Sequence, residues 1–195
     1  MQIMKGKFYL LFAIIVLFSS CNSILKKRKS NETCLSVQTE VPDRPVGQKH
    51  VQGLTTPKMD TVRVGFIGLG MRGPGAVQRF SHIVGTKIVA LCDLHPDRVE
   101  KAQTILDRTG RPRAAGYSGS EDAWKELCRR DDIDLVYIAT DWKHHAPMII
   151  FAMEQGKHVA CEVPAAMTLE EIWDVINTAE RTQKHCMQLE NCVYD

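Results

Sequence analysis

The sequence predicts an α/β fold, a parallel sheet doubly wound with helices, and three observations lead to it. Short runs rich in Val and Ile, typical of buried parallel strands, recur from residue 62 to residue 189. Stretches with helix start and stop signals lie between these runs. The residues that are unusual for a purely structural role gather where the runs end, and a sheet of this kind binds its ligands at that edge.

The first run, Val62–Ile67, leads into glycines at positions 68, 70 and 73. Gly68 allows a tight turn, Gly70 allows a pyrophosphate to approach the backbone, and Gly73 allows the next helix to pack closely on the strand. The N-terminus of that helix favours phosphate, because its N–H groups are free and its dipole is positive there. The spacing alone is a weak signal, since a glycine-bearing loop of an α/β fold can lack any nucleotide.

The second run, Lys87–Cys92, is followed by Asp93, twenty positions after Gly73. In dinucleotide-binding folds an acidic residue at this point binds the adenosine ribose. A carboxylate repels a 2′-phosphate, so the sequence predicts NAD in preference to NADP. The alternative is that Asp93 only caps a turn.

The remaining elements continue the alternation of helices and strands. Helices are expected over Pro74–His82, over Pro96–Arg108, over Glu121–Arg129 with Ser120 as N-cap, over Ala146–Gln155, and from Thr168 as N-cap to Arg181. Strands are expected over Asp134–Ala139, Lys157–Cys161 and His185–Leu189. Residues 111–118 are expected to form a loop with at most a short strand, and residues 140–145 an exit loop.

Charge and composition separate the N-terminal region from this folded part. The 195 residues include 25 Lys and Arg against 23 Asp and Glu. Residues 1–60 hold 9 of the basic and 4 of the acidic residues, so residues 61–195 hold 16 basic and 19 acidic residues. The folded part is therefore slightly acidic, which argues against nucleic-acid binding. Residues 22–60 are polar and contain prolines, so we expect a flexible tether before a domain over residues 61–195.

Residues 1–21 resemble the signal peptide of a bacterial lipoprotein. Two lysines precede the apolar run Phe8–Phe18, which is shorter than the roughly 20 residues of a membrane span but suits a secretory signal. Two serines then precede Cys21, which lipoproteins carry as the lipidated, palmitate-bearing first residue after cleavage. Phe18 departs from the usual Leu, so ordinary signal-peptide cleavage is the alternative. We expect an exported protein, lipid-anchored to the membrane on the periplasmic or outer-membrane face of the envelope.

The spacing of Cys and His residues predicts no metal site. The seven cysteines include no C-x-x-C motif, and Cys92, Cys161 and Cys186 fall in or beside expected buried strands. We expect these to be structural thiols. His144 and His145 are adjacent, so on a helix they point in different directions and do not share a ligand.

Four stretches at the strand ends carry a resemblance to the Gfo/Idh/MocA oxidoreductase-like family. They are GLGMRGPG, ATDWKHHAPM, CEVPAAMTLEE and ENCVYD, and the similarity extends from about Val62 to Asp195. Within that family they look most like glycoside hydrolase family 109, the NAD-dependent α-N-acetylgalactosaminidases. The resemblance implies a Rossmann domain followed by a C-terminal α/β substrate domain. We expect that second domain to be absent from this chain, which ends directly after the sixth strand.

The same resemblance implies which residues form the site. NAD would be held by Gly68, Gly70, Met71, Arg72, Gly73, Asp93, Trp142, Lys143, His144, His145, Glu162, Val163 and Asn191. Glu162 and Tyr194 are the candidate catalytic residues, for positioning or proton transfer. The alternatives are a structural histidine at position 145, simple packing for Trp142 and a structural Tyr194.

The implied reaction is hydrolysis of a terminal α-linked N-acetylgalactosamine by transient oxidation at the sugar C3, elimination and water addition. Glycosidases that depend on NAD are exceptions to the two-carboxylate scheme. Sugar dehydrogenases of the wider family usually have Glu-Lys-Pro, whereas this chain has Val163 in place of the Lys, and Val cannot move a proton. The alternatives are an NAD-dependent sugar dehydrogenase and a non-catalytic NAD-binding module. Homo-oligomerisation is a further expectation about partners.

Overall fold

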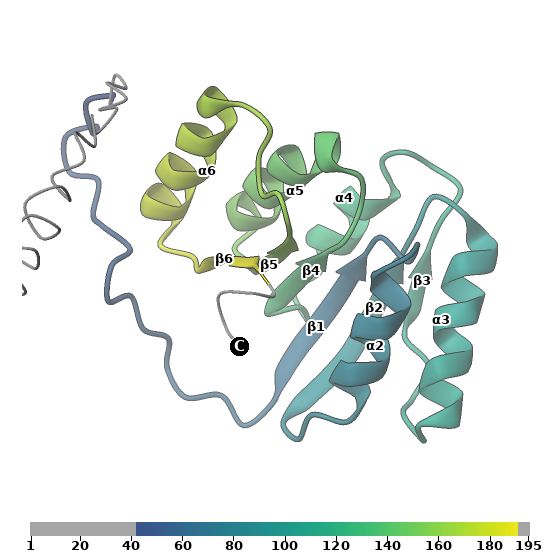
Figure 1. Cartoon of the computed structure of the whole chain (residues 1–195). Helices are drawn as coiled ribbons and strands as arrows, with labels where there is room; N and C mark the ends of the chain where they lie inside the picture. Colours follow the sequence, from purple (N-terminus) through teal and green to yellow (C-terminus); the bar gives the residue numbers. More distant parts are fainter. Residues whose placement is uncertain (1–41, 191–195) are drawn as a thin grey trace, which may run out of the picture. The chain divides into compact units, whose positions relative to one another are not determined.

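A computed structural model describes residues 42–190, whose helices and strands alternate along the chain (Figure 1). Cys21, Asn191 and Tyr194 lie outside the described residues. The elements are β1 (Val62–Ile67), α2 (Gly73–Ser81), β2 (Thr86–Cys92), α3 (Pro96–Arg108), β3 (Ala115–Tyr117), α4 (Ala123–Cys128), β4 (Leu135–Ile138), α5 (Trp142–Glu154), β5 (His158–Glu162), α6 (Leu169–Thr182) and β6 (Cys186–Leu189). No helix in this part of the chain is both long enough and apolar enough to cross a membrane.

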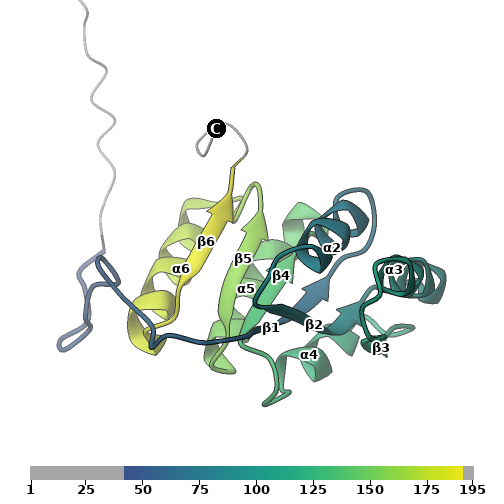
Figure 2. The same cartoon turned by 90° about the horizontal axis from the view of Figure 1, so that it is seen from below.

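The strands form a parallel sheet in the order β3-β2-β1-β4-β5-β6 (Figure 2). From β1 the chain first winds outward through β2 to β3 and then crosses back to β4 on the other side of β1. This is the doubly wound order that the sequence predicts, and its direction reverses between β1 and β4. Such a switch point leaves a crevice above the carboxyl ends of the two strands.

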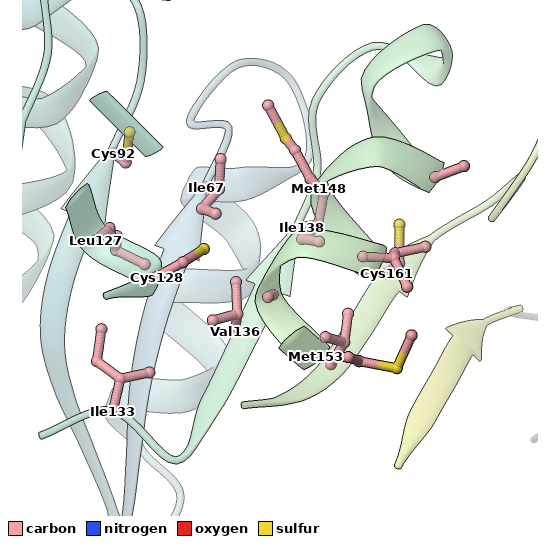
Figure 3. Packing of buried hydrophobic residues seen from close by; sticks show 14 of the residues in the cluster. Ile67, Cys92, Leu127, Cys128, Ile133, Val136, Ile138, Met148, Met153 and Cys161 are labelled. Carbon is pink, nitrogen blue, oxygen red and sulfur yellow. The ribbon is translucent and has the colours of Figure 1, made fainter. Parts of the chain in front are cut away.

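Each face of the sheet has its own core, because successive strand residues point to opposite faces. Phe66 and Tyr137 belong to the cluster that includes buried residues of α2 and α3. Ile67, Val136 and Ile138 belong to the cluster on the α4, α5 and α6 face, together with Leu127 and Met153 among others (Figure 3). Neighbouring residues of one strand thus pack against helices on both faces of the sheet. This packing holds in place the edge of the sheet that carries the site.

Helix α2 begins one residue before the predicted start, and two other helices begin two or more residues from theirs. Ser120 does not cap α4, because its hydroxyl accepts the N–H of Asp122 in a turn and the helix begins only at Ala123. The start of α5 was predicted four residues too late. The Asp141 carboxylate accepts the N–H of Lys143 and caps the helix, so residues 142–145 form its first turn and not a loop. Thr168 does cap α6, in a capping box with Glu171.

The described part of the expected tether, residues 42–60, has no helix or strand but contacts α6. The Arg44 guanidinium donates two hydrogen bonds to the Glu180 carboxylate, at 2.7 and 2.9 Å. The Gln48 side-chain amide donates to the same carboxylate at 2.8 Å. Residues 44–48 are therefore fastened to the domain, although their composition predicts a flexible segment.

The four described cysteines are free thiols, and Cys92, Cys128 and Cys161 are buried. Burial raises the pKa of Cys92 and of Cys128 to about 12, because a thiolate is poorly solvated inside the protein. Thiols that stay protonated are poor nucleophiles and poor metal ligands, so these side chains act as small apolar residues of the core.

Candidate cofactor site

A cleft of about 760 Å³ opens at the carboxyl ends of β1, β2, β4 and β5, at the switch point of the sheet. Most of the predicted site residues line it: Gly68, Gly70, Met71, Arg72, Asp93, Trp142, His144, His145, Glu162 and Val163. Gly73 and Lys143 lie next to lining residues without lining the cleft themselves. The sheet therefore brings together segments that are far apart in sequence.

Gly68 and Gly73 make the turn between β1 and α2 possible. Gly68 has a φ of +91°, and a Cβ at this position would lie 2.4 Å from the carbonyl oxygen of Ala139. A Cβ at Gly73 would lie 2.1 Å from the carbonyl oxygen of Gly68. Both distances are far inside van der Waals contact, so the tight turn and the close helix packing predicted for these two positions are confirmed.

The loop between them leaves room for a ligand. A Cβ at Gly70 would meet only the Arg98 guanidinium, at 3.6 Å. At the start of α2 no side chain caps the helix, and its first turn holds no acidic residue. Pro74 has no N–H, and the Ala76 N–H bonds the Arg72 carbonyl. The N–H groups of Gly73 and Gly75 are therefore the ones available to bind a phosphate, which the helix dipole favours.

Asp93 connects the glycine loop to the end of β2. One carboxylate oxygen accepts the N–H of Leu69 at 2.7 Å, and the other accepts the N–H of His95 at 2.9 Å. The Arg98 guanidinium lies 3.4 Å from the carboxylate. Asp93 caps a turn, as the alternative held, and it also lines the cleft. Each carboxylate oxygen can accept more than one hydrogen bond, so Asp93 retains capacity for a ribose hydroxyl.

The first turn of α5 presents side chains of two kinds. Trp142 is 60 % exposed at the cleft, which does not fit simple packing in the core. His144 is exposed and lies 2.7 Å from the Asp141 carboxylate. His145 is 1 % exposed, and its ring nitrogens lie 2.7 Å from the Pro164 carbonyl and 3.2 Å from the Thr140 carbonyl. It joins the exit loops of β4 and β5, which fits the structural alternative, while lining the cleft.

Glu162 ends β5 and lines the cleft, three strands along the sheet from β2, which Asp93 follows. Its carboxylate accepts a hydrogen bond from the Tyr137 hydroxyl at 2.6 Å. Sequence reasoning did not single out Tyr137 or Arg98 as parts of the site. A phenol inside the otherwise apolar run of β4, and an arginine in the first turn of the helix after Asp93, are the signals that point to them. Among the described residues no cluster of three or more His, Cys, Asp or Glu could hold a metal ion.

Residues 62–189 match the family model described as oxidoreductase family, NAD-binding Rossmann fold. The chain belongs to the Gfo/Idh/MocA family. Over 164 residues it is 73 % identical to glycosyl hydrolase family 109 protein 1 of Bacteroides fragilis, which covers 84 % of this chain and 35 % of that protein. Over 181 residues it is 65 % identical to glycosyl hydrolase family 109 protein 1 of Bacteroides thetaiotaomicron, with 93 % and 38 % covered.

This Gfo/Idh/MocA chain spans little more than a third of the length of these two relatives. Among solved structures, myo-inositol 2-dehydrogenase from Lactobacillus plantarum is similar with a TM-score of 0.59 and 26 % identity, covering 69 % of this chain and 38 % of that one. The comparisons confirm the predicted family, the Rossmann fold and NAD as the cofactor. The open glycine loop, the free helix end and Asp93 fit that cofactor.

Proposed function

We propose that this chain is the NAD-binding part of an exported glycosidase that removes terminal α-linked N-acetylgalactosamine. The observation that carries the proposal is Val163, which lines the cleft where dehydrogenases of the wider family usually have a lysine. The high identity to proteins named for glycosyl hydrolase family 109 supports the same conclusion.

The residues of the cleft divide the work between its two ends. The glycine loop and Asp93 would hold the pyrophosphate and the adenosine ribose, and Trp142, Glu162 and Val163 would lie beside the nicotinamide half. When bound, NAD supplies a reversible hydride acceptor for the sugar C3. Oxidation at C3 makes the neighbouring proton on C2 acidic. At this end of the cleft, the Glu162 carboxylate can position the substrate or accept a proton. Val163 has no proton to exchange, so the group that removes the C2 proton has to be another residue.

The proposal predicts exchange at the sugar C2. An aryl α-N-acetylgalactosaminide is hydrolysed in deuterated water by the protein expressed from the complete reading frame. We expect the released sugar to carry deuterium at C2, because elimination and water addition replace that proton with one from solvent. No stoichiometric rise in NADH absorbance is expected, because the cofactor ends each cycle oxidised. Mass spectrometry of the sugar and absorbance at the NADH band measure the two quantities.

The other results separate the alternatives. Sugar without deuterium at C2 would remove the elimination step. NADH that forms in proportion to product, without release of the aryl group, would establish a sugar dehydrogenase. A protein that retains NAD and shows neither reaction would be a binding module.

We also propose that the protein is lipid-anchored to the bacterial envelope through Cys21, a position outside the described residues. The lysines, the apolar run and the two serines before this cysteine support the proposal. Expression with labelled palmitate should place label on the unaltered protein and on the Cys34→Ser control, but not on Cys21→Ser. Label that persists in Cys21→Ser would contradict the anchor.

A further inference from the structure

Tyr137 is buried in a cluster of aromatic rings between the sheet and α2. Its ring stacks on Phe66 with centroids 5.0 Å apart and an interplanar angle of 28°, and it meets Phe80 edge-on at 5.6 Å. The residue is only 3 % exposed. Because aromatic rings in such clusters have few alternative rotamers, the position of the phenol oxygen is set by the core.

The sheet register directs this phenol toward Glu162. Tyr137 on β4 lies opposite Ala160 on β5. Glu162 follows two residues later, so it is on the same face of the sheet and one step closer to the cleft. The 2.6 Å hydrogen bond from the phenol to the carboxylate thus connects the buried core to a residue that lines the cleft.

The phenol acts as a donor throughout the neutral pH range. Burial is the main cause that raises the pKa of Tyr137, and the hydrogen bond to the Glu162 carboxylate raises it further, against a smaller lowering effect of Arg79. A protonated phenol beside a carboxylate is favourable when its hydroxyl donates to a carboxylate oxygen, as Tyr137 does to Glu162. Such charge-assisted hydrogen bonds are stronger than hydrogen bonds between neutral groups. The arrangement therefore restrains the Glu162 side chain, whose partner cannot move away without leaving the aromatic cluster.

We propose that Tyr137 is a positioning residue of the cofactor site, which holds the Glu162 carboxylate in the orientation that the nicotinamide half of NAD requires. The inference rests on the proposed NAD-dependent function, in which Glu162 lies at that end of the cleft. Tyr137 itself does not line the cleft and acts through Glu162. The carboxylate is thereby oriented before the cofactor arrives, which lowers the entropy cost of binding.

The test compares two ligands on the full chain. Calorimetry measures the affinity for NAD⁺, which fills both ends of the cleft, and for ADP, which fills only the adenosine and phosphate end. Tyr137→Phe keeps the ring in the cluster and removes only the hydroxyl. We expect its NAD⁺ affinity to fall roughly fivefold, the equivalent of one hydrogen bond of about 1 kcal/mol, with unchanged ADP affinity.

Two further variants make the result specific. Tyr117→Phe also removes a phenol hydroxyl, one that accepts a hydrogen bond from Arg130 outside the cleft, and should change neither affinity. In a Glu162→Ala background, Tyr137→Phe should cause no additional loss of NAD⁺ affinity, because the two residues act as one unit.

Three results would overturn the inference: unchanged NAD⁺ affinity in Tyr137→Phe, equal losses for NAD⁺ and ADP, or independent losses that add in the double variant. Equal losses would mean general damage to the domain. The readout is cofactor binding and not hydrolysis, so a failure here is distinguishable from a failure of the glycosidase proposal in the deuterium experiment.

Discussion

Gly68 and Gly73 depend on each other, since the backbone of the first occupies the space that a side chain on the second would need. Gly70 lies between them with open space toward the cleft. The three glycines of one motif therefore serve two purposes, two of them making the turn and one leaving room for the ligand. Asp93 adds a second restraint by accepting the Leu69 N–H within the same loop.

Alanine at two of these positions should separate folding from binding. Gly73→Ala places a methyl group against the Gly68 carbonyl, and overpacking of this kind costs about 1–3 kcal/mol of unfolding free energy. Gly70→Ala should change that free energy by less than about 0.5 kcal/mol, while its methyl group reduces NAD⁺ affinity by narrowing the approach of the pyrophosphate. Thermal unfolding and calorimetry measure the two effects. A Gly73→Ala protein with unaltered stability would contradict the packing role.

At helices α5 and α6, single side-chain contacts determine the structure of a neighbouring segment. Asp141 begins α5 early, which turns residues predicted as a loop into a helical turn with Trp142 and His144 exposed and His145 buried. On α6, the Glu180 carboxylate accepts hydrogen bonds from Arg44 and Gln48. A segment with the composition of a linker is thereby attached to the domain.

The attachment to α6 should weaken in acid. The hydrogen bonds from Arg44 and Gln48 lower the pKa of Glu180 to about 2, from an ordinary value of 4.5. A carboxyl whose pKa is lowered by folding stabilises the folded state above its unfolded pKa, and this contribution is lost as the pH falls through the folded pKa. We expect the contribution of Glu180 to disappear between about pH 4.5 and pH 2.

Urea unfolding at several pH values measures this contribution, with Glu180→Gln beside the unaltered chain. The variant should be less stable at neutral pH, and its stability should fall less across the acid window. Glu154→Gln is the matched control, because Glu154 pairs with Arg181 at an exposed position where ion pairs contribute little. Parallel pH curves for Glu180→Gln and the unaltered chain would show that residues 44–48 are not held by this carboxylate.

The cleft as a whole depends on the order of the strands. The glycine loop follows β1, Asp93 follows β2, the first turn of α5 follows β4 and Glu162 ends β5. In a parallel sheet all these points lie at one edge, and the reversal between β1 and β4 separates the helices that would otherwise cover it. Two cores, one on each face, hold the four strands in register and so hold the site together.

Local patterns were sufficient to predict the strands other than β3, most helix limits to within two residues, the turn at Gly68 and the acid at Asp93. These features depend on apolar periodicity, backbone freedom and spacing within a few residues, all of which are properties of a short stretch of chain. The start of α5 differs from the prediction because residues 140–145 were assigned to the loop after a strand, whereas Asp141 caps a helix there.

The contacts that shape the site could not be predicted in this way. The hydrogen bonds of His145 with Pro164, Tyr137 with Glu162 and Arg44 with Glu180 join residues 19, 25 and 136 positions apart. Which partner each side chain meets depends on strand register and on the packing of helices against each face, and these arise only when the whole sheet assembles. The sequence determines the chemical character of each residue, but the assembled domain determines which residues pair with one another.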